Sequence, residues 1–267
     1  MILREHKFDD TYISLIDEYY TPNSKDKFVK EIANLIKDSD KIGFAGYLTR
    51  SMLKNQLRNE IFDNKSKPKG SGKVIDDSDL KLIIKTIKKC KKEIPSKQLH
   101  IFVFPTFSDH VIKRMDGATG STPYHNTFNI FVVPYKFTKV SLENTVCHEY
   151  FHAVYRHDNY KLLDRMINEG LAEHFREHVI GGKRAEWAKA VSSKKCKIIF
   201  MKLRSKLKTK NYHLISKILF GSKDYRMWTG YSIGYNIVKD YLKNTKRSWK
   251  DIVKKKPEEI LSHSNFD

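Results

Sequence analysis

The chain has 267 residues, and its 51 lysine and arginine residues against 31 aspartate and glutamate residues give a formal net charge of +20. Hydrophobic residues make up 40% of the sequence and aromatic residues 12%, which excludes a disordered chain and predicts one large domain or two small ones. Lysine supplies 40 of the cations and arginine 11, so the charge indicates a lysine-rich surface more than a dedicated anionic partner.

The sequence also indicates the cellular compartment of the protein. The N-terminus becomes charged after three residues, and proline interrupts the longest apolar runs, 101–107 and 128–135, so we expect neither a signal peptide nor a membrane span. The chain has an odd number of cysteines, and none of them form a C-x-x-C pair: Cys90, Cys147 and Cys196. These features favour a reducing, cytoplasmic setting.

Residues 1–98 are predicted to form a helical N-terminal region. A polar, cationic stretch rich in glycine and proline at 64–73 predicts an exposed loop inside it, and Pro95 ends its last helix. The helical prediction depends on apolar residues that recur at helical spacing in three segments, 28–36, 52–61 and 80–87.

Residues 99–267 are predicted to form a second domain of the α+β class. A small β-sheet is expected over 99–135, from two β-rich runs joined by a segment that contains Asp116-Gly117-Ala118-Thr119-Gly120. Two helices should follow, one over 141 to about 156 and one over 162 to about 180, and Gly181-Gly182 should end the second of them. The remainder, 181–267, is predicted to be mostly helical.

An H-E-x-x-H motif lies at 148–152, in the middle of the first of those two helices. Residues four apart share one helical face, so His148 and His152 can bind one zinc ion. Glu149 lies about 100° further round the helix, beside the open coordination position, where it can take a proton from water. A pair of polar residues on a solvent face is the simpler alternative, and it would leave Glu149 unexplained.

The rest of this helix carries an apolar arc that is expected to pack on the core. Cys147 lies in that arc, which favours a small buried side chain over a metal ligand.

A second motif, N-E-G-L-A-E, follows at 168–173. A catalytic zinc ion usually has three protein ligands, and a carboxylate from a second, packed helix can supply the third, so Glu169 is the predicted ligand. Glu173 is four residues further on the same face and can accept the free N–H group of a ligand histidine. Without the first motif, the two glutamates would read as an exposed acidic stripe.

Together the two motifs resemble the gluzincin metallopeptidases, and His148–His152, Asn168–Phe175 and the later segment 228–235 more closely resemble a bacterial family of predicted zinc-dependent proteases whose substrates are unassigned. The resemblance covers about residues 99–245. It implies a zincin-like fold with zinc held by His148, His152 and Glu169 and with Glu149 as the base. Glu173 stands where thermolysin-like proteins have Asp, so the side chain expected to contact a ligand histidine is longer here.

The resemblance also implies two further roles. Gluzincins use a downstream Tyr or His to stabilise the oxyanion, and Tyr231 is the preferred candidate here, although core packing is the more common role of a tyrosine. Gly117 and Ala118 lie about 30 residues before His148, where related proteins have the strand that aligns the substrate. A plain hairpin turn is the alternative for these two residues.

Two functions from different classes follow. The first is a cytoplasmic zinc metallopeptidase that acts on a peptide or protein substrate. The second is a basic, nucleic-acid-associated or regulatory protein with a structural or inactive zinc site, suggested by the charge and by the cationic runs 85–92 and 194–210. Apolar residues keep helical spacing within the first run, which favours a solvated helix face, and the sequence contains no zinc finger, RNA-recognition signature or basic zipper.

Overall fold

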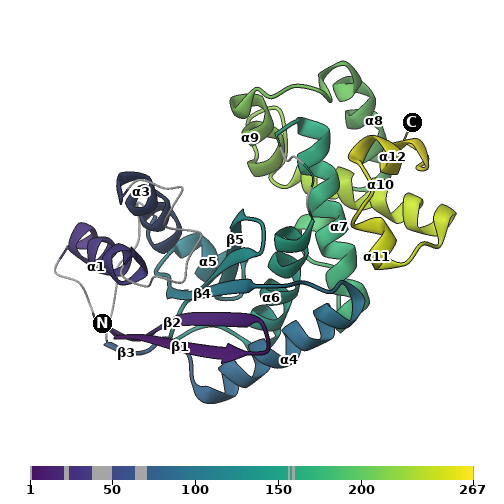
Figure 1. Ribbon diagram of the computed structural model, residues 1–267. Helices are drawn as coiled ribbons and strands as arrows, with labels where there is room; N and C mark the ends of the chain where they lie inside the picture. The colour runs from purple at the N-terminus through teal and green to yellow at the C-terminus, as the bar shows by residue number, and fades with distance from the viewer. Residues whose placement is uncertain are drawn as a thin grey trace. The chain divides into compact units, whose positions relative to one another are not determined.

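The computed structural model describes residues 2–20, 24–37, 50–63, 71–155, 157 and 160–266 (Figure 1). Within these residues the fold is α+β, as predicted, and no helix is long and apolar enough to cross a membrane. The chain divides into two compact units. The first comprises Met1–Lys91 and Ser96–Ala153, and the second comprises Lys92–Pro95 and Val154–Asp267.

The first unit is built on a mixed sheet with the strand order β1-β2-β4-β6-β5, and β3 pairs with β2. The β2–β4 and β4–β6 pairs are parallel, whereas the remaining pairs are antiparallel. The central strands β4 and β6 are almost entirely buried, and β5 forms one edge. The strands are β1 (Ile2–Phe8), β2 (Thr11–Tyr20), β3 (Ser71–Lys73), β4 (Leu99–Pro105), β5 (Ala118–Tyr124) and β6 (Thr127–Val132).

The prediction of an all-helical N-terminal region is wrong for residues 2–20, which form the hairpin of β1 and β2. Asp9 takes a positive φ of 49° in the turn, and β2 is rich in the β-branched and aromatic residues that favour strands. The predicted division at residue 98 therefore runs through the sheet, because β2 pairs with β4. Of the predicted loop 64–73, residues 64–70 lie outside the described residues and the last three form β3.

The three predicted N-terminal helices are confirmed. In α4 the apolar positions Ile83, Ile87 and Cys90 are fully buried while most of the intervening lysines face solvent, so the cationic run 85–92 is the solvated face of an amphipathic helix. The helices of the first unit are α1 (Lys25–Lys37), α3 (Arg50–Ile61), α4 (Asp77–Glu93, of which the last two residues belong to the second unit), α5 (Asp109–Arg114) and α6 (Lys139–Val154, of which the last residue belongs to the second unit).

The second unit is helical, as predicted for the C-terminal region. The helix predicted at 162–180 is confirmed as α7 (Leu162–Ile180), and Gly181 follows it with a φ of +72°, which suits a glycine at a helix end. The other helices of this unit are α8 (Ser193–Leu203), α9 (Tyr212–Phe220), α10 (Thr229–Thr245), α11 (Trp249–Ile252) and α12 (Pro257–Ser262), with short 3-10 turns at Trp187–Lys189 and Arg204–Lys206.

Two glycines let α7 and α10 pack with their backbones in close approach. A Cβ atom added to Gly170 would lie 2.4 Å from the backbone of Gly234, and one added to Gly234 would lie 1.7 Å from the carbonyl oxygen of Met166. Neither position has room for a side chain unless the helices move apart. The glycine of the N-E-G-L-A-E motif therefore has a packing role of its own.

We expect Gly234→Ala to destabilise the protein by about 2 kcal/mol or more, because the new methyl group meets a backbone carbonyl that cannot rotate away. Helix propensity alone predicts the opposite sign, a gain of about 1 kcal/mol. The free energies of unfolding of the variant and the wild type, measured in urea, distinguish these two predicted effects. A variant as stable as the wild type would show that α7 and α10 are not in backbone contact at this position.

Candidate metal and catalytic site

Helix α6 carries the H-E-x-x-H motif, and a reciprocal cap fixes its first turn. The backbone N–H of Ser141 donates to Oγ1 of Thr138 at 2.9 Å, and the backbone N–H of Thr138 donates to Oγ of Ser141 at 3.1 Å. The Ser141 hydroxyl also donates to the carbonyl oxygen of Asp116 at 2.8 Å. These bonds satisfy donors that a helix N-terminus leaves without partners, and they join α6 to the segment before β5.

The predicted division of α6 into an apolar arc and a motif face is confirmed. His148 and His152 are half-buried, and the carboxylate-bearing Glu149 is only 7% exposed. The Sγ atom of Cys147 lies 3.5 Å from Sγ of Cys90, in the core of the first unit and away from the motif face. Six residues of the arc are fully buried, and Val154, the seventh, is 8% exposed: the six are Leu142, Val146, Cys147, Tyr150, Phe151 and Ala153.

The two histidines of the motif converge. Nε2 of His148 and Nε2 of His152 lie 3.0 Å apart, with the ring planes at 80° to one another. A tetrahedral zinc ion with bonds of about 2.0 to 2.1 Å would hold two such nitrogens about 3.3 Å apart, so this donor pair fits zinc. Neutral imidazole nitrogens are also ligands that zinc prefers.

Glu149 lies against the edge strand β5. Oγ1 of Thr122 donates a hydrogen bond to Oε2 of Glu149 at 2.8 Å and lies 3.2 Å from the backbone oxygen of the same residue. A second carboxyl group faces this region from α3, where burial and then the charge of Glu149 raise the pKa of Glu60 to about 7. No local sequence pattern marks Glu60 or Thr122, because their proximity to Glu149 is created by the fold.

The predicted substrate-binding residues Gly117 and Ala118 lie at the start of β5. The N–H of Gly117 donates to the carbonyl of Val111 at 3.1 Å, and the carbonyl of Gly117 accepts from Val133 at 2.8 Å. The N–H of Ala118 donates to the carbonyl of Met115 at 3.2 Å. These groups are therefore engaged within the unit. Substrate binding at Gly117 and Ala118 stays a prediction.

The second motif lies on α7, in the second unit. Glu169 is half-buried, and its neighbour Asn168 is 6% exposed. The role of Glu169 as a metal ligand stays a prediction.

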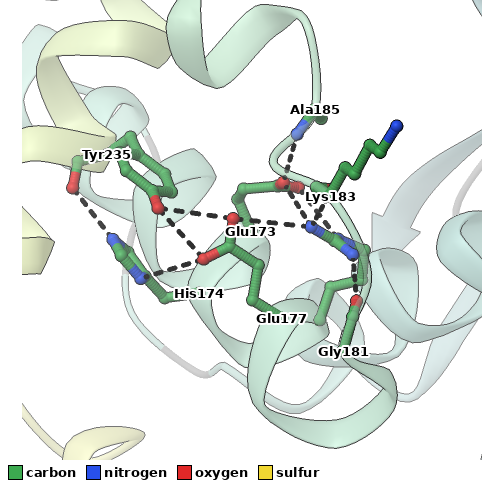
Figure 2. A network of polar contacts seen from close by, with 8 residues as sticks. Glu173, His174, Glu177, Gly181, Lys183, Ala185 and Tyr235 are labelled. Atoms are coloured by element: carbon green, nitrogen blue, oxygen red, sulfur yellow. Dashed lines mark hydrogen bonds and ion pairs between the residues drawn. The ribbon is translucent and has the colours of Figure 1, made fainter.

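Glu173 forms a buried ion pair that the sequence did not reveal (Figure 2). Its Oε1 accepts from Arg176 Nη2 at 2.8 Å and from the backbone N–H of Ala185 at 3.0 Å. Arg176 also donates to the carbonyls of Gly181 at 2.6 Å and Lys183 at 3.1 Å. Glu173 and Arg176 together hold the turn after α7 in place. The predicted contact of Glu173 with a ligand histidine stays a prediction.

The predicted oxyanion residue Tyr231 lies in the first turn of α10, where it is half-buried with its ring 6.5 Å from that of Phe220. Its role stays a prediction. The other tyrosine of this segment, Tyr235, donates its hydroxyl to Glu177 at 3.0 Å, and its ring stacks on His174 at 4.0 Å (Figure 2). Burial, followed by the charge of Glu177, raises the pKa of the Tyr235 phenol to about 12.

His174 predicts a specific pH dependence of stability. Burial lowers the pKa of its imidazole from 6.5 to about 4 in the folded chain. As the pH falls below 6.5, this histidine becomes protonated in the unfolded chain but stays neutral in the folded chain. The free energy of unfolding therefore decreases between about pH 6.5 and 4. We expect His174→Gln to reduce the difference in unfolding free energy between pH 7 and pH 4.5 by about 2 kcal/mol. Urea unfolding at both pH values measures this, and an unchanged difference would contradict it.

A helix with two converging histidines and a buried glutamate between them defines a candidate zinc site of the kind found in metallohydrolases. Comparison with known families agrees, because the model of the family described as predicted Zn-dependent protease (DUF2268) matches residues 80–262. The chain belongs to this family. No curated protein and no solved structure matches the chain.

Proposed function

We propose that the protein is a zinc-dependent metallopeptidase that hydrolyses peptide bonds in a peptide or protein substrate. The observation that carries the proposal is the 3.0 Å approach of His148 Nε2 to His152 Nε2, with the buried Glu149 between them in sequence. Membership of a family described as predicted Zn-dependent protease supports it.

His148 and His152 would hold the zinc ion, and we propose that Glu169 completes the ligand set. This set has two neutral nitrogens and one carboxylate, which leaves a position for water or substrate, as in catalytic rather than structural zinc sites. It is also the set that the gluzincin resemblance implies. A gluzincin assignment and a zincin-like core are part of the same proposal.

When bound, zinc supplies a Lewis acid that polarises the scissile carbonyl and acidifies water. Glu149 acts as the general base: its carboxylate takes a proton from the attacking water and returns it to the leaving amine. Tyr231 is proposed to donate a hydrogen bond to the oxyanion, and Glu173 to orient a ligand histidine.

The substrate is proposed to pair with the edge strand β5 by backbone hydrogen bonds. Ala118 is the first residue of this strand and Gly117 directly precedes it, and the N–H groups of both are bonded within the unit. We therefore propose that Gly117 and Ala118 fix where the exposed edge of β5 begins, and that the backbone of residues 119–121 forms the hydrogen bonds with the substrate.

We propose that the net charge of +20 reflects a lysine-rich surface more than a nucleic-acid partner. Lys89 and Lys91 on α4 form ion pairs with Glu143 and Asp10. The free cysteines are buried, which agrees with the proposal that the protein acts in the cytoplasm.

The experiment is metal depletion followed by reconstitution, with a peptide library as substrate. We expect a chelator to abolish cleavage and stoichiometric zinc to restore it. Magnesium, which prefers oxygen ligands, should not restore cleavage. Cleavage that survives complete removal of zinc would refute the metallopeptidase assignment. Absence of cleavage by the zinc-loaded protein, across the whole library, would count against peptidase action.

A further inference from the structure

We propose that Thr122 is a positioning residue that fixes the carboxylate of the general base Glu149. This inference deepens the proposed function and rests on it. The two residues belong to different elements of the first unit, β5 and α6, and are 27 positions apart in the sequence. Their contact is therefore a product of the fold.

The contact is a short, charge-assisted hydrogen bond. Oγ1 of Thr122 donates to Oε2 of Glu149 at 2.8 Å, within the range of a strong hydroxyl–carboxylate bond. Glu149 is 7% exposed, so its carboxylate has lost most of its water and needs donors from the protein. Thr122 supplies one.

The same side chain also lies close to the β5 backbone at Gly120. A Cβ atom added to Gly120 would lie 2.3 Å from Cγ of Glu149 and 2.9 Å from its Oε1. Gly120 and Thr122 therefore both lie against the Glu149 side chain of α6. Gly120 leaves the space that the Glu149 side chain fills, and Thr122 binds the carboxylate at its end.

The strand is irregular at this position. The antiparallel pairing of β5 with β6 shifts its register between Ser121 and Tyr124, and Thr122 lies within the interruption. Irregularities of this kind redirect side chains and are frequent beside active sites. The Thr122–Glu149 hydrogen bond lies at this irregularity.

A fixed carboxylate matters because a general base must lie within hydrogen-bonding reach of the proton that it removes, and a displacement of about 1 Å can cost about a hundredfold in rate. Thr122→Val keeps the shape and removes the donor, whereas Thr122→Ser keeps the donor. Thr86→Val is the matched control, because Thr86 bonds only to the carbonyl of Leu82 among its described hydroxyl contacts and lies on α4.

In the zinc-loaded protein we expect Thr122→Val to lower kcat at least tenfold with KM changed less than about twofold. Thr122→Ser should recover kcat to within about threefold, and Thr86→Val should keep it. Equal kcat for Thr122→Val and Thr86→Val would overturn the inference.

A second readout needs neither zinc nor activity. In the metal-free protein, a double-mutant cycle of Thr122→Val and Glu149→Ala measured by urea unfolding should show non-additivity of about fivefold in the unfolding equilibrium constant. Additive effects would overturn the contact itself. Non-additivity in a protein that cleaves nothing would keep the contact and refute the peptidase function, so the two failures are distinguishable.

Discussion

Glu149→Gln is expected to lower kcat for peptide hydrolysis by about a thousandfold or more. The amide keeps the shape of the side chain and can still accept a hydrogen bond from Thr122, but it cannot take a proton from water. Zinc content should remain at the wild-type level, because Glu149 is not among the proposed ligands. Steady-state kinetics on a peptide substrate, together with metal analysis of the same samples, measure both quantities.

Glu143→Gln on the same helix is the matched control, since Glu143 lies outside the motif and pairs with Lys89 at 2.9 Å. It should retain activity within about threefold, as expected for the loss of a partly exposed ion pair outside the motif. If Glu149→Gln keeps full activity, Glu149 is not the base.

Arg176→Met is expected to destabilise the protein by about 3 to 5 kcal/mol. Arg176 is 2% exposed, and its partner Glu173 is 1% exposed. The substitution leaves a buried carboxylate with the N–H of Ala185 as its remaining described donor in the turn, and it removes the donors to the carbonyls of Gly181 and Lys183. Breaking a buried pair from one side costs this much because the other charge stays buried. Chemical unfolding measures the loss.

The control for this variant is Arg184→Met. Arg184 is exposed and lies over the ring of Tyr235 at 4.3 Å, so its loss should cost about 1 kcal/mol or less. A double variant, Arg176→Met with Glu173→Leu, should be more stable than Arg176→Met alone, because it also removes the buried negative charge whose arginine has been lost. If Arg176→Met costs less than about 1 kcal/mol, the pair does not hold the turn after α7.

The motif helix could be predicted from sequence because its information is local. Helical periodicity places His148 and His152 on one face of α6 and the apolar residues on another, and the structure has this division. The bounds of α7 were predicted for the same reason: its apolar pattern is regular, and glycines follow its last residue.

The contact of Thr122 with Glu149 was not predictable, because it joins residues 27 positions apart through the packing of β5 on α6. Arg176 and Glu173 are only three positions apart on α7, but their burial and the bonds of Arg176 to the turn after α7 depend on tertiary packing that the helical spacing does not show. Nothing in the local sequence indicates that Gly170 meets Gly234. The N-terminal strands are a different case, since the β-branched and aromatic residues of β2 and the two aspartates before it are a readable strand signal.

Zinc content, measured by elemental mass spectrometry on the purified chain, tests the central claim most directly. The account predicts about one zinc ion per chain in the wild type and almost none in His148→Ala/His152→Ala, with Glu149→Gln at the wild-type level. A folded wild-type protein that contains no zinc and cannot be reconstituted with it would contradict the account.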